Sequence, residues 1–312
     1  MAARSKGGKR GGGTQRIPVG AAGRFADRFR VTHPKRFRLK HVDPADTWRL
    51  RSREQAAGLL QRGIERLAEM QEMLWAKDQW SLLLVFQAMD AAGKDSTIKH
   101  VMSGVNPQGC QVHSFKQPSA EELDHDFLWR TTCRLPERGR IGIFNRSYYE
   151  EVLVVRVHSE LMMRQKLPSR LITKDIWKQR FESINDLERH LARNGTAIRK
   201  FFLHVSKEEQ RKRFEERLQR PEKHWKFAVS DVQERAHWDR YQHAYEDMIR
   251  NTSTPHAPWY VVPADRKWFT RLVVAAAVVD ALEDLQLEWP KVDSAKRKEI
   301  AMARELLETE GR

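Results

Sequence analysis

Hydrophobic positions along the chain follow two spacings, and each spacing predicts one kind of element. From Arg53 to Trp75, apolar residues recur three or four positions apart, which places them on one face of a helix. The run from Leu82 to Phe86 is apolar at every position, as expected for a parallel strand covered by helices on both faces. The pattern therefore predicts an amphipathic helix that leads into a buried central strand.

The same alternation continues toward the C-terminus. Further apolar runs typical of strands lie at Ile141–Phe144, Phe201–Val205 and Trp259–Val262. Long helices are expected over Thr173–Asn194, which Gly195 ends, and over Trp268–Leu287. Strands that alternate with helices predict an α/β fold, with a central, mostly parallel sheet and helices on both of its faces.

One stretch before the last predicted strand differs in composition from the rest. A basic helix is expected over Lys207–Gln219 and ends before Pro221, and the segment Arg217–Phe227 mixes Arg, Lys, His, Trp and Pro. We interpret residues 207 to 230 as a helical lid on one main domain, residues 41 to 290. A charged helix, Ser294–Leu307, is expected in the remaining segment, residues 291 to 312.

The net charge of +15 is concentrated near the N-terminus. Residues 1 to 40 hold twelve Lys or Arg and one acid, so they contribute +11 and leave only +4 for the remaining chain. Glycine and charge do not form a core, which predicts a disordered basic extension over residues 1 to 40. Whether it only solubilises the chain or also gathers a polyanion stays open.

Composition excludes several classes of protein. No apolar run reaches the eighteen or more residues that a membrane helix needs, and no apolar segment follows the basic start, so neither a membrane span nor a secretory leader is expected. The cytoplasm is the expected location. Cys110 and Cys133 have no CxxC spacing, which argues against a disulfide framework or a zinc site.

A phosphate-binding loop is predicted directly after the first strand, in the sequence AMDAAGKDST from Ala88 to Thr97. Phosphate binding needs successive backbone N–H groups, small side chains and a helix N-terminus. The expected phosphate contacts are Met89, Ala91, Ala92, Gly93, Asp95, Ser96 and Thr97, and Lys94 would reach the phosphates as a catalytic point charge. Ala88 and Asp95 depart from the common GxxxxGK[ST] pattern, and Ser96 and Thr97 compensate in part.

A second motif, IGIFNRSYYEE, covers Ile141–Glu151 and brings polar groups to the end of another strand. Open α/β sheets bind ligands at that edge. Arg146 is suited to fork onto a transferring phosphoryl group, and Glu150 to hold magnesium directly or through water.

The chain resembles the polyphosphate kinase 2 family through four stretches, MDAAGKDST, FNRSYYEEVL, ELDHDFLWR and RPEKHWKF. The resemblance covers roughly residues 42 to 290. It implies a P-loop kinase fold, homo-oligomers, Mg²⁺ or Mn²⁺ as the metal, and phosphate transfer between inorganic polyphosphate and nucleoside mono- or diphosphates such as AMP, ADP, GMP and GDP.

The resemblance also implies roles for single residues. Asp90 looks like the catalytic carboxylate that positions the metal and the accepting phosphate, and Lys94 looks like the lysine of the phosphate loop. The second motif contains Asn145, Arg146 and Glu150. With Asn145 in it, the motif resembles the subgroup whose members accept both nucleoside mono- and diphosphates. Four cations fall on the family's lid: Arg217, Arg220, Lys223 and Lys226.

A loop that leaves the second strand supplies candidates for the acceptor nucleotide. Lys116, Arg130 and Arg134 are expected near its phosphates, and a capping box of Ser119 and Glu122 would open the helix between them. Three aromatic residues are candidates either for stacking on a base or for the core: Trp129, Tyr148 and Tyr149.

Two other functions share part of this pattern. An ATP-dependent nucleoside monophosphate kinase shares the phosphate loop and an arginine-rich lid, but needs a pocket for its donor base. A nucleic-acid-binding protein would account for the basic extension, but the sequence shows no helix-turn-helix and no interleaved aromatic and basic surface.

Overall fold

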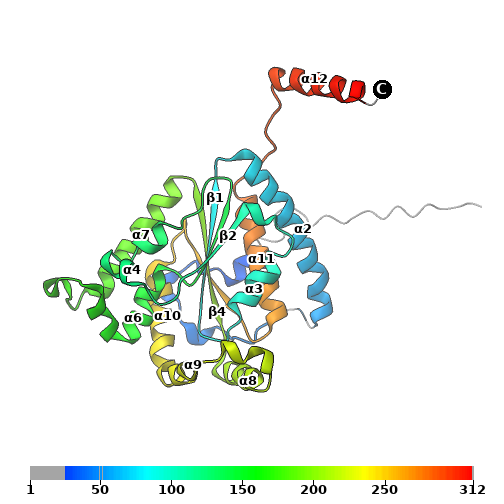
Figure 1. Cartoon of the computed structure of the whole chain (residues 1–312). Coiled ribbons are helices and arrows are strands. Elements are labelled where there is room, and N and C mark those ends of the chain that lie inside the picture. Colours follow the sequence, from blue (N-terminus) through cyan, green and yellow to red (C-terminus); the bar gives the residue numbers. More distant parts are fainter. Residues whose placement is uncertain (1–24, 49, 51, 311–312) are drawn as a thin grey trace, which may run out of the picture.

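The computed structural model describes residues 25 to 48, 50 and 52 to 310, apart from the side chain of Lys226. Its centre is a sheet of five parallel strands in the order β2-β3-β1-β4-β5 (Figure 1). The strands are β1 Ser81–Ala88, β2 Cys110–Ser114, β3 Ile141–Asn145, β4 Thr196–His204 and β5 Trp259–Pro263. All eight residues of β1 are buried, so the predicted central strand is confirmed.

Helices cover both faces of the sheet, as predicted. One face carries α2 Arg53–Lys77, α3 Lys94–Val101 and α11 Lys267–Glu283, and the other carries α6 Val154–Val157, α7 Ile176–Arg193 and α10 Trp238–Thr252 (Figure 1). Helix α11 packs against α2, α3, β4 and β5 at once. The helix therefore tolerates the run of small and branched apolar residues from Leu272 to Val279, because all eight residues of that run are buried.

The remaining helices are shorter or lie at the edge of the domain. They are α4 Ala120–Asp124, α5 Trp129–Thr132, α8 Lys207–Leu218, α9 Val229–Gln233 and α12 Ser294–Glu310. The predicted capping box opens α4: Ser119 Oγ accepts from the N–H of Glu122 at 3.2 Å, and the Glu122 carboxylate accepts from the N–H of Ser119 at 2.8 Å.

Residues 25 to 40 correct the prediction of a disordered extension. Phe29 and Leu39 are buried in the core, and the Val31 N–H donates to the Trp259 carbonyl oxygen at 2.9 Å. Aromatic residues set among the charges explain the difference, since Phe25 and Phe29 both pack edge-on against Phe269. The part of the predicted extension formed by residues 1 to 24 lies outside the described residues.

Strand β4 begins five residues earlier than its apolar run predicts. Arg199 and Lys200 interrupt the apolar pattern, yet both are buried. Each has a carboxylate partner, Asp284 for Arg199 at 2.6 Å and Glu188 for Lys200 at 2.5 Å. Buried charges need such partners, and both partners belong to other elements, Asp284 directly after α11 and Glu188 on α7.

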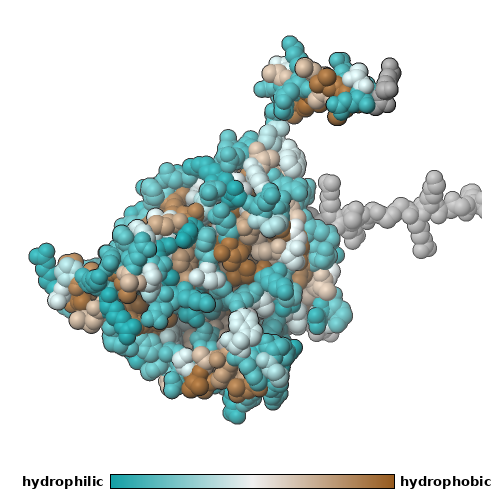
Figure 2. Space-filling view, viewed as in Figure 1, coloured by the Kyte–Doolittle hydropathy of each residue, from teal (hydrophilic) through white to brown (hydrophobic). Residues whose placement is uncertain are grey.

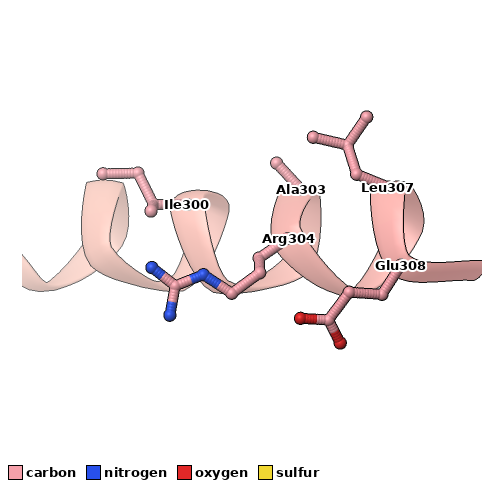
Figure 3. Close-up of a pocket in the computed structure, with 5 residues that line it drawn as sticks. All are labelled: Ile300, Ala303, Arg304, Leu307 and Glu308. Carbon is pink, nitrogen blue, oxygen red and sulfur yellow. The ribbon is translucent and has the colours of Figure 1, made fainter.

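Helix α12 stands apart from the sheet domain in Figure 1, and all its residues are exposed. Brown side chains on it in Figure 2 correspond to exposed apolar residues such as Ile300 and Leu307. Figure 3 shows Ile300, Ala303 and Leu307 along one side of the helix, with Arg304 and Glu308 turned to the other. None of the described helices combines the length and the apolarity that crossing a membrane requires.

Candidate active site

The predicted phosphate loop joins β1 to α3 at the carboxyl edge of the sheet. Ala91 has φ = +59° and Gly93 has φ = +103°, so left-handed conformations recur within three residues. Glycine adopts such a conformation without penalty, whereas for alanine it costs about 1–3 kcal/mol. Left-handed residues next to right-handed ones turn successive N–H groups toward one side, which is the geometry of an anion-binding nest. Gly93 is also the N-cap of α3, whose N-terminus favours an anion.

Lys94 is buried beneath this loop, with only 9% of its surface exposed. Its Nζ donates to the carbonyl oxygen of Ala88 at 2.9 Å. Burial and, to a smaller extent, nearby Arg146 lower the pKa of Lys94 to about 8, although Asp90 and Glu150 oppose the change. A phosphate in the loop would favour the charged lysine, so the position suits a residue that acts on a bound polyanion.

The two predicted motifs meet through Arg146. Its guanidinium pairs with Asp90 at 2.9 Å and with Glu150 at 3.0 Å. Its backbone is left-handed, with φ = +63°, and its N–H donates to the Phe86 carbonyl oxygen at 3.0 Å, which fixes the turn after β3. The pKa of Arg146 lies above its usual value, chiefly because of Glu150 and further because of Asp90, so the charge is permanent.

Two further contacts tie the motifs together. Asn145 Nδ2 donates to Asp95 Oδ1 at 2.8 Å, so the end of β3 lies beside the start of α3. With the amide of Gln87 oriented so that its oxygen accepts from Ser147, its nitrogen donates to Glu150 Oε1 at 2.8 Å. Ser96 Oγ donates to the Gly93 carbonyl oxygen at 3.0 Å, which supports the loop from inside.

A small pocket opens over Asp90, Arg146 and Glu150. It is closed on the far side by residues that follow the lid and by α10, and its lining is Ala88, Met89, Asp90, Arg146, Glu150, Val154, Gln210, Asp231, Glu234, Arg235, Tyr241 and Tyr245. Burial raises the pKa of Asp231, and the nearby carboxylate of Asp90 raises it further. The pocket thus gathers four carboxylates with two arginines around the end of the phosphate loop.

The predicted lid cations lie around the short helical turn Pro221–Lys226 between α8 and α9. Arg220 pairs with Glu222 at 2.8 Å on an exposed surface, Arg217 lies over the Phe214 ring, and Lys223 is half-buried. The side chain of Lys226 is not among those described. The structure therefore places the lid next to the pocket through Gln210, with Asp231 directly after the lid, and does not bring Arg220 onto the phosphate loop.

The candidates for the acceptor nucleotide are placed unevenly. Lys116 and Arg134 are exposed. Arg130 is half-buried, pairs with Glu122 at 3.3 Å and covers the Phe115 ring. Trp129 stacks on His125 with ring centroids 4.0 Å apart. Nothing in these contacts tests the acceptor role, which stays a prediction.

Tyr148 and Tyr149 belong to the core, so they are not available for stacking on a base. Both hydroxyls donate to Glu188 Oε1, at 2.9 and 2.7 Å. Lys200 Nζ donates to Glu188 Oε2, to the Tyr149 hydroxyl and to the Thr252 carbonyl oxygen. This fully buried network anchors the turn between Arg146 and Glu150 to the sheet.

Three residues at the site were missed by sequence reasoning: Gln210 and Arg235, which line the pocket, and Arg213, which binds carbonyl groups of the phosphate loop. They lie on α8 and just after α9, where the charged and polar sequence predicts a solvent-exposed surface. Helix α10 was missed as well, although its apolar residues Trp238, Tyr241, Tyr245, Met248 and Ile249 recur three or four apart and carry a helical signal.

The chain is similar to proteins of one known family. Residues 49 to 290 match the family model described as Polyphosphate kinase 2. The ADP-polyphosphate phosphotransferase of Rhodopseudomonas palustris is 53% identical over 257 residues, which cover 82% of this chain and 89% of that protein. The AMP/ADP-polyphosphate phosphotransferase of Meiothermus ruber is 46% identical over 275 residues, or 87% of this chain and 98% of that protein.

A solved structure agrees with the fold. The crystal structure of Polyphosphate Kinase 2 from Arthrobacter aurescens superposes with a TM-score of 0.83 at 42% sequence identity, and covers 90% of this chain and 96% of that one. The predicted family and the predicted P-loop kinase fold are both confirmed.

Proposed function

Since the chain belongs to the polyphosphate kinase 2 family, we propose that it transfers phosphate between inorganic polyphosphate and nucleoside mono- or diphosphates, with AMP and ADP as acceptors. The relatives that support this proposal act, by their names, on ADP or on AMP and ADP. The reverse reaction uses the same site, and substrate concentrations set its direction.

The observation that carries the proposal is the meeting of the two loops at one edge of the sheet. Phosphoryl transfer passes through a loose transition state, so an enzyme mainly aligns donor and acceptor and neutralises charge. The nest around Gly93, the buried cation of Lys94 and the guanidinium of Arg146 supply both functions without a covalent intermediate.

The carboxylates suit magnesium better than a softer metal. Asp90 and Glu150 offer only oxygen ligands, and no group of three or more His, Cys, Asp or Glu among the described residues is arranged to hold a metal ion. Mg²⁺ commonly binds one or two carboxylates and completes its shell with waters and substrate phosphates. Asp90 and Glu150 would hold it in that way, and it would neutralise charge on the phosphates. Manganese is the alternative metal.

Glu150→Gln is expected to raise the magnesium concentration for half-maximal activity several-fold. The amide keeps the shape of the side chain but removes a negative charge that pairs with Arg146 and attracts the metal. A magnesium titration of initial rates measures the effect. Glu182→Gln is a matched control, because Glu182 is an exposed residue of α7 whose side chain pairs weakly with Lys178 at 3.9 Å. An unchanged titration for Glu150→Gln would remove Glu150 from the metal site.

A direct assay tests the proposed function. Purified protein, long-chain polyphosphate, Mg²⁺ and ADP, with no ATP added, should yield ATP, and AMP in place of ADP should yield ADP. A parallel reaction with AMP and ATP but no polyphosphate tests the competing nucleoside monophosphate kinase. The proposal fails if the wild-type protein forms no nucleoside di- or triphosphate from polyphosphate.

Three finer points stay predictions: the use of GMP and GDP, assembly into a homo-oligomer, and a cytoplasmic location. The same assay with guanine nucleotides tests the first of them. The prediction that both acceptor levels are used rests on Asn145 through the resemblance to that subgroup, and the hydrogen bond from Asn145 to Asp95 lies beside the phosphate loop.

A further inference from the structure

The carbonyl groups of the phosphate loop are held from behind by one helix. Gln210 Nε2 on α8 donates to the Asp90 carbonyl oxygen at 2.9 Å. One turn later, Arg213 Nη1 donates to the carbonyl oxygens of Ala91 at 3.0 Å and Ala92 at 2.9 Å. Two side chains of α8 therefore bind three consecutive carbonyl groups of the loop.

These hydrogen bonds affect phosphate binding, because the carbonyl group and the N–H group of each peptide unit point in opposite directions. A loop that binds an anion through its N–H groups must turn the carbonyl oxygens away from it, where they need donors if they are buried. Gln210 and Arg213 are 1% and 4% exposed, so their donors replace water at these carbonyl groups.

Arg213 also ties the loop to a second part of the sheet edge. Its Nη2 donates to the carbonyl oxygens of Ala264 at 2.7 Å and Asp265 at 3.2 Å, which follow β5, and its Nε pairs with Glu209 at 2.8 Å. The planar guanidinium can span both loops at once, and a lysine ammonium cannot reproduce that fork.

Gln210 connects the phosphate loop to residues near both ends of the lid. Its Oε1 accepts from Arg235 Nη1 at 2.6 Å, and the same nitrogen of Arg235 donates to the Lys207 carbonyl oxygen at 3.0 Å. Lys207 is the first residue of α8 and of the lid, and Arg235 follows the lid. The amide of Gln210 thus joins the phosphate loop to both ends of the lid segment.

From these contacts we infer that Gln210 and Arg213 are positioning residues. They hold the carbonyl groups of residues 90 to 92 inward, so that the N–H groups of Ala91 and Gly93 face the phosphates, whereas the Ala92 N–H donates to the Met89 carbonyl oxygen at 3.3 Å. They also couple the loop to the base of the lid. The inference rests on the proposed function and adds to it the residues that shape its phosphate site.

Arg213→Lys and Gln210→Met test the inference through the affinity for pyrophosphate, measured by calorimetry in the absence of nucleotide. Misplacement of reacting groups by about 1 Å can cost about 100-fold in rate. We expect the Kd for pyrophosphate to weaken about tenfold or more in each variant, and kcat/KM for polyphosphate with ADP to fall by about 10- to 100-fold. Arg189→Ala is the control, since Arg189 is an exposed arginine of α7, outside the lid, and pairs with Asp186 at 2.5 Å.

The two readouts separate positioning from stability. Partial unfolding lowers the measured number of sites and kcat, but leaves the Kd of the folded fraction unchanged. The inference is overturned if both variants bind pyrophosphate within twofold of the wild-type Kd. Gln210→Met keeps it testable if Arg213→Lys does not fold, because it replaces an uncharged side chain by one of similar size. A wild-type protein that binds pyrophosphate but makes no ATP would instead refute the proposed function.

Discussion

Lys94→Ala should reduce kcat for ATP formation from polyphosphate and ADP by at least 10²- to 10³-fold, the loss typical of removing one preorganised group that stabilises transition-state charge. Lys94 is the cation buried beneath the phosphate loop, where low exposure strengthens its action on developing charge. Initial rates at saturating substrate measure the loss. Lys99→Ala is the matched control, because Lys99 lies on the same helix, α3, and is exposed.

The fold of the Lys94→Ala variant should survive, because the wild-type lysine lies at an unfavourable place for a charge. Its pKa of about 8 in the folded protein is below the usual 10.5, so the unfolded chain binds more protons between those values. The wild-type protein therefore gains stability from this group as pH rises from about 8 to 10.5, and carries its cost below pH 8. Removing the amine abolishes that cost together with one hydrogen bond to Ala88.

The same pKa predicts how activity depends on pH. In the free enzyme Lys94 loses its proton as pH rises through about 8, so kcat/KM should fall above that pH. Bound phosphate favours the charged lysine, so the corresponding fall in kcat should appear at higher pH.

A kcat for Lys94→Ala within tenfold of wild type, in protein with a normal unfolding transition, would contradict the assignment of Lys94.

The parts of the site that sequence reasoning predicted are those encoded locally. The buried run Leu82–Phe86 followed by AAGK fixes a strand, a turn and a helix start within a few residues, and the polar groups after Phe144 follow from the same rule. Asp90, Lys94, Arg146 and Glu150 meet because β1 and β3 are parallel neighbours, with Phe86 opposite Asn145. Each motif is recognisable from its local sequence, and the pairing of β1 with β3 brings the two motifs together.

The parts that could not be predicted depend on pairs far apart in the chain. Arg213 lies in a helix so rich in charge that it reads as solvent-exposed, and only the fold places it under Ala91 and Ala92, more than 120 residues earlier. Lys200 interrupts the apolar run of β4 although it is buried, because its partner, Glu188 on the preceding helix α7, is itself a charged residue of an amphipathic helix. Buried polar groups with distant partners leave no periodic signal in the sequence.

Lys200→Met should lower the free energy of unfolding by about 3–5 kcal/mol, the usual cost of removing one partner of a buried ion pair. Lys200 and Glu188 are both 0% exposed, and the lysine alone makes hydrogen bonds to Glu188, the Tyr149 hydroxyl and the Thr252 carbonyl oxygen. Without it, the Glu188 carboxylate retains only the two tyrosine hydroxyls as partners among the described residues. Denaturant unfolding measures the change.

Two comparisons make this prediction specific to the buried pair. Lys178→Met removes the cation of an exposed pair with Glu182 on the same helix as Glu188, and should change the free energy of unfolding by about 0–1 kcal/mol. The double variant Glu188→Gln with Lys200→Met removes both charges, yet keeps an oxygen that accepts from Tyr148 and Tyr149. It should be more stable than Lys200→Met alone, because no unpaired charge then stays buried. If Lys200→Met were as stable as Lys178→Met, the network would not be what anchors the turn from Arg146 to Glu150.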